Sequence, residues 1–367
     1  MNLRKENSVL VLLGAGASKE AEIPTSAEMI ERVEHLLTTN SDWQSYRSLY
    51  YFVKSAIYFA DGIDGKFNAD VNYNIERLVN TLSELDKKAR HPLYPFIGNW
   101  NIKLAELGGD DFKRIGELRQ MIIRALQGDW VLLSDYSKSE YYRGLYSFAQ
   151  DFQFPLRVFS LNYDLCMEKN RKTEILERGF GDQRKWSWRN FDHTEEAPNI
   201  YLYKLHGSID WLRDEHKNLT FSDEASKIRL DQLEIIFGTD YKLQYTDPFL
   251  FLAYEFRRWT LEAKLIITIG YGFGDEHING ILGQALASAA DPDERKLLAV
   301  STFFQKEEES AARTRLAGIL DVSENCIVAK RKTASEFMCS DMRIDKLGEH
   351  FPEGGDLFEE LPNLPAK

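Results

Sequence analysis

The chain has 367 residues, of which 43% are hydrophobic and 28% are charged, as is usual for globular proteins. This length is sufficient for one large domain or two smaller ones with a full hydrophobic core. The formal net charge of −12 argues against a broad nucleic-acid surface, which needs clustered Lys and Arg. No apolar run approaches the ~18 residues that a membrane-spanning helix requires. We therefore expect neither nucleic acid nor a membrane as a partner.

The cysteines restrict the compartment and the metal chemistry. Only Cys166, Cys326 and Cys339 occur, and they are odd in number and widely spaced. This usage is typical of a reducing cytoplasm, and three cysteines cannot form a four-cysteine zinc site. The sequence therefore predicts a cytoplasmic protein without a bound metal.

The first element is predicted at residues 9–13, where a continuous apolar run is typical of a central strand covered on both faces. Gly14 and Gly16 follow directly, and they allow the backbone to turn tightly and approach a ligand. Such turns direct backbone N–H groups at a phosphate, which predicts a nucleotide ligand. A simple tight turn is the alternative explanation.

The same stretch imitates a secretory signal, because Arg4 and Lys5 precede the apolar run and small residues follow it. The apolar core of about five residues is shorter than the ~7–15 residues of a signal peptide. Cleavage there would also remove the first strand of the α/β pattern. We therefore expect no signal peptide.

Helical patterns fill the next part of the chain. Thr25 and Glu28 have the spacing of a capping box, and apolar residues at helical spacing follow them. Further helical patterns cover 43–59, 75–85 and 112–126. No strand pattern occurs between residues 20 and 150, which predicts a helical insertion over 25–150. Trp43 and Tyr50 are expected to be exposed and to make this insertion an interface.

After residue 150 the pattern alternates between strands and helices, as in a parallel sheet. Strands are predicted at 156–160, 200–205, 233–237, 264–269, 296–301 and 326–329, and helices at 163–178, 248–261, 278–290 and 307–320. The fold class predicted is α/β, a doubly wound parallel sheet that is Rossmann-like. Its domain would comprise 1–24 and 151–350, and an acidic tail, 351–367, would be loosely ordered.

Polar clusters follow several of these strands, where doubly wound sheets bind their ligands. Besides the glycine turn they are SLNYD at 160–164, KLHGS at 204–208 and GYGFGD at 270–275, with His277, Ile278 and Asn279 entering the next helix. Each cluster also has an ordinary structural explanation. Asn162 and Asp164 are common helix caps, His206 is also explained as a turn residue, and glycines are frequent in turns. The occurrence of four such clusters at one predicted sheet edge favours a binding site.

The order of these clusters resembles that of sirtuins: GAG-x-S after the first strand, an N-x-D element, a His-Gly pair and a late glycine-containing strand end. The sequence motifs LNYD, KLHGSIDW and GYGFGDEHIN are most similar to those of divergent sirtuin-like NAD-consuming proteins of bacterial anti-phage defence. The resemblance covers about 9–290, without the helical insertion except residues 74–76. A Rossmann dehydrogenase is disfavoured, because Lys19 stands at the position of the third glycine of G-x-G-x-x-G.

The resemblance implies NAD as the substrate and a role for each cluster. Gly14, Ala15, Gly16 and Ser18 would hold the diphosphate, Asn162 and Asp164 would line the nicotinamide-ribose pocket, His206 would be the general base, and Gly270, Gly272 and Asn279 would face the adenosine. Cleavage of the nicotinamide–ribose bond creates oxocarbenium character at the anomeric carbon. A side-chain amide can hold the attacking water in line, and an imidazole can accept its proton at neutral pH.

The chain departs from protein deacylases in two respects. It lacks the cysteines for their zinc ribbon, and Pro24 precedes Thr25-Ser26-Ala27 where deacylases have Asp-Phe-Arg. Water is therefore the expected acceptor, which predicts an NAD+ glycohydrolase acting as an effector of abortive anti-phage defence. A zinc-free deacylase, an ADP-ribosyltransferase and a non-catalytic NAD or ADP-ribose sensor remain alternatives. A free NAD hydrolase would kill its host, so we expect control through self-association as a homo-oligomer, through a partner protein, or both. The resemblance implies a HerA-family ATPase as that partner.

Overall fold

The computed structural model describes residues 8–66, 73–88, 102–109, 112–181, 183–192, 197–237, 247–288, 294–302 and 308–352. The main sheet contains β1 (Val9–Leu13), β2 (Leu156–Ser160), β3 (Leu176–Glu177), β4 (Ile200–Lys204), β8 (Leu265–Ile269), β9 (Lys296–Val300) and β10 (Ile327–Lys330). A small sheet contains β5 (Gly207–Arg213), β6 (Leu219–Phe221) and β7 (Leu233–Ile235). The helices are α2 (Ser26–Thr39), α3 (Ser41–Gln44), α4 (Arg47–Ile63), α5 (Ile75–Lys88), α7 (Ile102–Gly108), α8 (Lys113–Ala125), α9 (Arg143–Phe152), α10 (Cys166–Lys169), α11 (Phe249–Glu262), α12 (Glu276–Ala287), α13 (Glu309–Leu320), α14 (Ala334–Glu336) and α15 (Ile344–Gly348).

The main sheet is parallel and seven-stranded, in the order β10-β9-β8-β1-β2-β4-β3. From β1 the chain first builds outward through β2 and β4, and then returns to build β8, β9 and β10 on the other side. The strand order therefore reverses at β1, which is where doubly wound sheets bind ligands. This arrangement confirms the predicted α/β, doubly wound parallel sheet.

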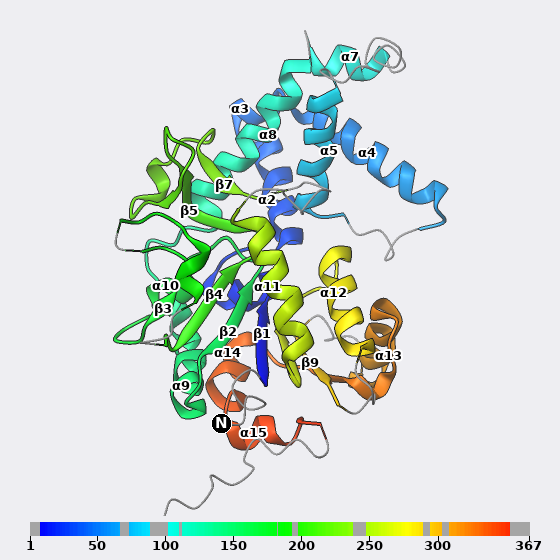
Figure 1. The fold of residues 1–367 in the computed structure, drawn as a ribbon. Coiled ribbons are helices and arrows are strands. Elements are labelled where there is room, and N and C mark those ends of the chain that lie inside the picture. The colour runs from blue at the N-terminus through cyan, green and yellow to red at the C-terminus, as the bar shows by residue number, and fades with distance from the viewer. Residues whose placement is uncertain are drawn as a thin grey trace, which may run out of the picture.

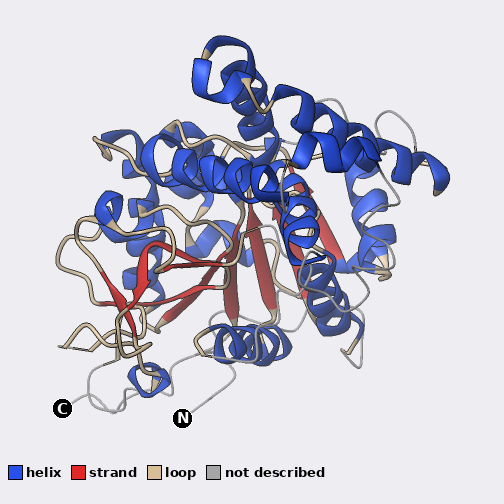
Figure 2. Cartoon of the chain, turned by 90° about the horizontal axis from the view of Figure 1, so that it is seen from above, coloured by secondary structure: helices blue, strands red, loops and turns tan. Residues whose placement is uncertain are grey.

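Helices cover both faces of the sheet, as Figures 1 and 2 show. Because side chains alternate along a strand, Val9, Val11 and Leu13 join one hydrophobic core, and Leu10 and Leu12 join the other. The first core includes side chains of α2, α4, α5, α8 and α9, and the second includes side chains of α11, α12 and α13. Burial on both faces explains why β1 is apolar at every position.

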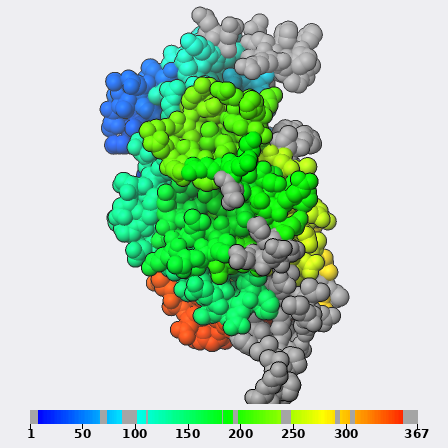
Figure 3. All heavy atoms as spheres, turned by 60° about the vertical axis from the view of Figure 1, so that its left-hand side comes forward, coloured from blue at the N-terminus to red at the C-terminus, as the bar shows by residue number. Residues whose placement is uncertain are grey.

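The helices between β1 and β2 share the first core with the sheet. Most of them gather at the upper end of the molecule in Figure 1, and they are blue to cyan in Figure 3. Helix α2 begins with the predicted capping box of Thr25 and Glu28. The described part of residues 20–150 contains no strand, as predicted. The domain boundaries drawn from the sequence stay a prediction.

Two predictions about the helical part are wrong. The pattern at 43–59 forms two helices, α3 and α4, rather than one. Trp43 and Tyr50 are buried rather than exposed. Tyr50 lies at helical spacing with Val53 and Ile57 on the buried stripe of α4, and its hydroxyl donates a hydrogen bond to Glu34 (2.7 Å).

Two predictions about the sheet also need correction. Residues 163–178 contain the short helix α10 instead of one long helix, because the Asn170 side chain donates to Ser139 Oγ (2.7 Å) and to the Cys166 carbonyl (2.8 Å). The edge strand β3 then follows. The strand predicted at 233–237 pairs antiparallel with β5 in the small sheet and not with the main sheet. Residues 353–367 of the predicted tail lie outside the described residues.

Candidate active site

The glycine turn after β1 packs directly against the loop after β8. The Gly14 N–H donates to the Ile269 carbonyl (2.9 Å), and the Gly16 N–H donates to the Gly270 carbonyl (2.9 Å). A Cβ on Gly14 would lie 2.6 Å from Tyr271 Cα, which is closer than atoms can approach. Close packing between the two loops therefore requires glycine here, and both N–H groups are used inside the protein.

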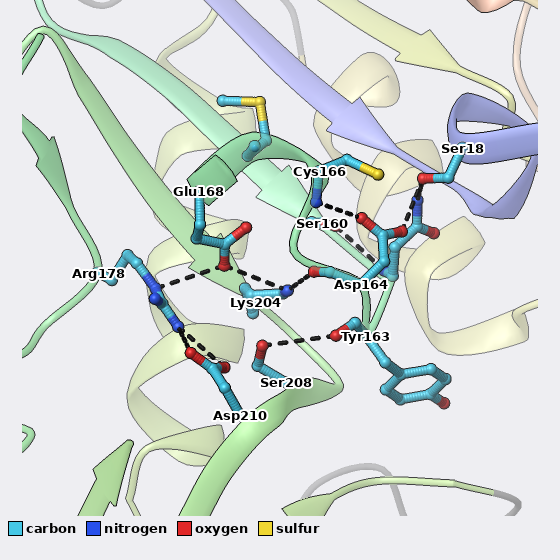
Figure 4. A network of polar contacts seen from close by, with 12 residues as sticks. Ser18, Ser160, Tyr163, Asp164, Cys166, Glu168, Arg178, Lys204, Ser208 and Asp210 are labelled. Atoms are coloured by element: carbon cyan, nitrogen blue, oxygen red, sulfur yellow. Dashed lines mark hydrogen bonds and ion pairs between the residues drawn. The ribbon is translucent and has the colours of Figure 1, made fainter. Parts of the chain in front are cut away.

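The Ser18 hydroxyl joins three of the neighbouring segments, and its side chain is completely buried. It donates to Asp164 Oδ2 (2.7 Å), as Figure 4 shows. A hydroxyl has one hydrogen, so its contacts with Asn162 Nδ2 (3.1 Å) and the Tyr142 hydroxyl (2.8 Å) are bonds that it accepts. Burial and the Asp164 charge raise the pKa of Tyr142 well above its ordinary value, so this phenol stays protonated and can donate.

The Asn162 side chain is held in one orientation. Its Nδ2 donates to the Gly14 carbonyl (2.9 Å) and to Ser18 Oγ. Because the Gly14 carbonyl can only accept, this contact identifies the amide nitrogen. Both amide hydrogens are thus in use, and Oδ1 makes no hydrogen bond with the described residues. Asn162 consequently offers an acceptor, and not a donor, to a ligand.

Asp164 connects Ser18 and Asn162 to a buried network of charges. Its Oδ1 accepts from the Cys166 N–H (2.9 Å), and its carbonyl accepts from the Lys204 ammonium. Lys204 also lies 3.4 Å from Glu168 Oε1. Burial raises the pKa of the Cys166 thiol, and the Asp164 carboxylate raises it further, so the thiol stays protonated. The Asp164 carboxylate thus organises the loop after β2.

The network continues to the start of β5 (Figure 4). Arg178 Nε lies 3.4 Å from Glu168 Oε1, and its Nη2 lies 2.7 Å from Asp210 Oδ2. Burial by itself would raise the pKa of Asp210. Arg178 and Lys204 outweigh that effect and hold the pKa of Asp210 below its ordinary value. The ion pairs therefore fix β4, β5 and α10 relative to one another.

A cavity beneath these loops has room for about one water molecule, since its volume is about 10 Å³. It is lined by Leu13, Tyr142, Ser160, Asp164, Met167, Glu168, Leu202 and Lys204. A dinucleotide cannot enter this space.

His206 follows β4 and is only 4% exposed. Its carbonyl accepts from the Ile236 N–H (2.8 Å), and its ring lies 6.4 Å from the Tyr163 ring between centroids. Its Nε2 lies 3.5 Å from Asp275 Oδ2. Its Nδ1 is buried and has no hydrogen-bond partner among the described residues. A buried nitrogen without a partner is costly, which makes it a candidate for binding a ligand.

The loop after β8 is held by its own side chains. The Tyr271 hydroxyl donates to Asn279 Oδ1 (2.8 Å), and Asn279 Nδ2 donates to the Phe273 carbonyl (2.9 Å). Gly272 is different, because a Cβ there would meet nothing within 4 Å. In this loop, Gly272 therefore has open space beside it, whereas Asn279 stabilises the turn. Contacts of either residue with adenosine stay a prediction.

The start of α5 lies at the same edge of the sheet. Burial raises the pKa of Tyr163, and the carboxylates of Glu76 and Asp275 raise it further. The same two carboxylates raise the pKa of Tyr271, for which burial is again the largest cause. The sequence predicts residues 74–76 as the part of the helical insertion at the site, and the charge effect of Glu76 is consistent with that prediction.

Several residues of this region had no role in the sequence prediction. Lys204 and Asp275 lie inside the recognised clusters KLHGS and GYGFGD, so their position after a strand was the available signal. Tyr142, Glu168 and Arg178 carry no such signal. They come from helical or irregular segments, and only the tertiary structure brings them to the site.

Two kinds of feature are absent from the described ranges. None of their helices is long and apolar enough to cross a membrane. Within those same ranges, no three or more His, Cys, Asp or Glu side chains are grouped so that they could hold a metal ion.

The chain was compared with curated proteins, solved structures and family models. No curated protein matches this chain. A solved Sir2 homologue in complex with NAD is 13% identical with a TM-score of 0.40, over 92% of this chain and 90% of that chain. A Sir2 complex with a p53 peptide and NAD+ is 11% identical with a TM-score of 0.37, over 90% of each chain. Residues 156–319, which include Asn162, Asp164, His206, Gly270 and Asn279, match the model of the SIR2-like domain.

Proposed function

We propose that this protein is an NAD+ glycohydrolase, which cleaves the nicotinamide–ribose bond with water and releases nicotinamide and ADP-ribose. The observation that carries the proposal is the hydrogen bonding of the Asn162 side chain. Both of its amide hydrogens are donated inside the protein, and Oδ1 is left as an acceptor. His206, with its unpartnered Nδ1, follows the neighbouring strand β4. An O–H acceptor and a base at one sheet edge are what hydrolysis requires. The match to the SIR2-like domain supports NAD as the substrate.

In the proposed reaction, the bond between C1′ of the ribose and the nicotinamide nitrogen breaks, and its electron pair leaves with nicotinamide. A water oxygen bonds to C1′, which carries oxocarbenium character in the transition state. Asn162 Oδ1 accepts a hydrogen bond from the water or from a ribose hydroxyl and so holds it in line. His206 accepts the proton that the water loses.

Water is the proposed acceptor because this chain cannot build the zinc ribbon that frames the acyl-lysine groove of deacylases. It has three cysteines, of which Cys166 and Cys326 are buried and Cys339 is exposed. We accordingly propose that the reaction needs no metal. A chelator should change neither the stability nor the NAD cleavage of the purified protein. Stoichiometric zinc that activity requires would contradict this.

The test measures nicotinamide, ADP-ribose and cyclic products by mass spectrometry after purified protein is mixed with NAD+. We expect His206→Ala and Asn162→Ala each to lower NAD+ cleavage by about 100-fold or more. His216→Ala is the matched control, because His216 is exposed in the turn between β5 and β6 and should keep full activity. Near wild-type turnover in either site variant would refute the mechanism.

The assay also separates the alternatives. Deacylation of an acyl-lysine peptide or labelling of a protein would indicate a deacylase or an ADP-ribosyltransferase. Tight NAD binding without turnover would indicate a sensor. Asn162→Ala is expected to lower the melting temperature as well, because Asn162 is buried and ties Gly14 to Ser18. Thermal unfolding of each variant must therefore accompany its kinetics.

The biological setting is proposed from the sequence resemblance alone. In that setting the hydrolase is an effector of abortive anti-phage defence in the cytoplasm. A free NAD+ hydrolase would harm its own cell, so its activity must be held low until infection. We propose control through self-association and a partner protein, with a HerA-family ATPase as the expected partner.

A further inference from the structure

Asp275 is fixed in place opposite His206. It is the N-cap residue of α12, and its Oδ1 accepts from the N–H groups of His277 (3.1 Å) and Ile278 (3.3 Å). Its other oxygen, Oδ2, lies 3.5 Å from His206 Nε2. Both side chains are more than nine-tenths buried. The cap therefore orients the carboxylate, and the carboxylate faces one particular nitrogen of the imidazole.

This contact determines where the imidazole proton lies. A neutral imidazole carries one N–H, and a carboxylate can only accept a hydrogen bond. The proton therefore belongs on Nε2, toward Asp275, and Nδ1 keeps its lone pair. The distance of 3.5 Å is long for a hydrogen bond, and such contacts often tighten when substrate binds. Nδ1 is the nitrogen that is buried without a partner among the described residues.

We propose that Asp275 is a positioning residue which holds His206 as the Nε2–H tautomer and makes Nδ1 the proton acceptor of the cleavage step. The catalytic part of this inference rests on the proposed NAD+ glycohydrolase function. As water bonds to C1′ and nicotinamide leaves with its electron pair, the proton from water passes to Nδ1. The imidazolium that forms then donates from Nε2 to the Asp275 carboxylate.

The surrounding charges support this arrangement. The carboxylates of Asp275 and Glu76 both act on Tyr163 and Tyr271, the two phenols beside this region. Burial, with these charges, raises the pKa of both phenols, so both stay neutral. Since both phenols are neutral, the charged group that faces the imidazole here is Asp275, whose Oδ2 lies 3.5 Å from His206 Nε2.

Asp275→Asn tests the inference sharply, because the helix cap decides how the new amide is oriented. The N–H groups of His277 and Ile278 need an acceptor, and Asn is as good an N-cap as Asp. The amide oxygen therefore keeps the cap, and the amide N–H₂ is turned toward His206. This amide donor makes His206 Nε2 the hydrogen-bond acceptor. The imidazole proton then lies on Nδ1, which can no longer accept a proton from water. Glu276→Gln is the matched control, since it removes one negative charge from the next, exposed residue.

The first readout needs no activity. Histidine ¹⁵N NMR of the full chain, with the His206 signals assigned by their loss in His206→Gln, reports the tautomer directly. We expect Nε2–H in the wild type and in Glu276→Gln, and Nδ1–H in Asp275→Asn. An Nδ1–H tautomer in the wild type would overturn the inference. That measurement applies even if Asp275→Asn does not fold.

The second readout is kinetic. We expect Asp275→Asn to lower kcat for NAD+ about 100-fold or more with KM nearly unchanged, and Glu276→Gln to keep both. If wild type hydrolyses NAD+ but Asp275→Asn retains kcat within about twofold, the catalytic role of Asp275 is wrong. If no hydrolysis occurs but the tautomer still changes, the proposed function fails while the pairing stands. The two failures are thus distinguishable.

Discussion

The hydroxyl of Ser18 shows how single side chains hold the loops of this site together. It contacts Asp164, which is 146 positions away in the sequence, and also Asn162 and Tyr142. These contacts turn Ser18 inward, although the sequence resemblance implies that it holds a diphosphate. Its side chain is completely buried and its hydrogen is donated to Asp164. Ser18 therefore positions Asn162, whereas a contact of Ser18 with the ligand stays a prediction.

Two glycines of the loop after β8 provide a matched pair of substitutions. Gly270 has a φ of +63°, and a Cβ there would lie 2.1 Å from the Ala17 nitrogen. We expect Gly270→Ala to lower the free energy of unfolding by more than about 2 kcal/mol, because backbone strain and a clash combine. Gly272→Ala adds a Cβ in open space and should change stability by less than about 0.5 kcal/mol. Urea unfolding of the two variants measures both values.

The pair also tests the predicted place of the ligand. If Gly272 faces the adenosine, as the sequence resemblance implies, Gly272→Ala should raise KM for NAD+ while its stability stays at the wild-type value. An unchanged KM would show that the adenosine does not bind beside Gly272. Equal stability of the two variants would contradict the packing described between Gly270 and the glycine turn.

At the scale of elements, a paired arginine and glutamate tie α9 to the segment before β3. Arg143 donates from Nη2 to Glu174 Oε1 (2.7 Å) and from Nη1 to Oε2 (2.9 Å). Such bidentate pairs have a defined geometry. The Arg143 hydrogen bonds lower the pKa of Glu174 to about 2, although burial opposes this. The segment that contains Glu174 is not helical, although the sequence pattern predicts a helix over 163–178.

This pair predicts part of the acid sensitivity of the protein. The pKa of folded Glu174 lies below its ordinary value of 4.5, so its stabilisation is complete above about pH 4.5 and is lost as the pH falls toward 2. We expect Glu174→Gln to lower the free energy of unfolding at pH 7 by on the order of 2 kcal/mol. The variant should also lose less stability than wild type between pH 4.5 and 2.

Urea unfolding at a series of pH values measures this effect. Asp151→Asn is the control, because Asp151 is exposed on the same helix α9 and should follow the wild-type curve. Identical pH curves for wild type and Glu174→Gln would show that the pair does not contribute to acid stability.

At the scale of the whole molecule, the helical part between β1 and β2 is not separate from the sheet, because both share one hydrophobic core. Its buried aromatics, Trp43 and Tyr50, cannot form an interface. The exposed apolar side chains of the described part include Phe59 and Ile63 on α4, each 70% exposed, and Ile102 on α7. These side chains are the relevant ones for the interface that the sequence predicts in this region.

We expect a stable homo-oligomer with low NAD+ hydrolysis, which a separate gene product raises. Light scattering of the purified protein measures the mass against 42.5 kDa for one chain. Phe59→Glu should reduce the mass if α4 contributes to the interface, because burying an unpaired charge is costly. A fully active monomer that needs no partner would refute this prediction.

The sequence by itself determined most of the sheet. Strands β1, β2, β4, β8, β9 and β10 lie within a few residues of their predicted positions. The reason is physical: strands of a parallel sheet are buried on both faces, so each is a short continuous apolar run that stands out locally. The carboxyl ends of parallel strands share one edge, and therefore the polar clusters after them could also be brought together from sequence alone.

The tertiary structure alone decided what those clusters contact. Asn162 and His206 were named from their clusters, but the inward orientation of Ser18 and the pairing of His206 with Asp275 were not predictable. Each of these contacts joins segments distant in the chain, and its geometry depends on how the strand-end loops pack against one another. The end of α10 was missed for the same reason, because Asn170 bonds to Ser139 in another segment. Local periodicity carries no information about such partners.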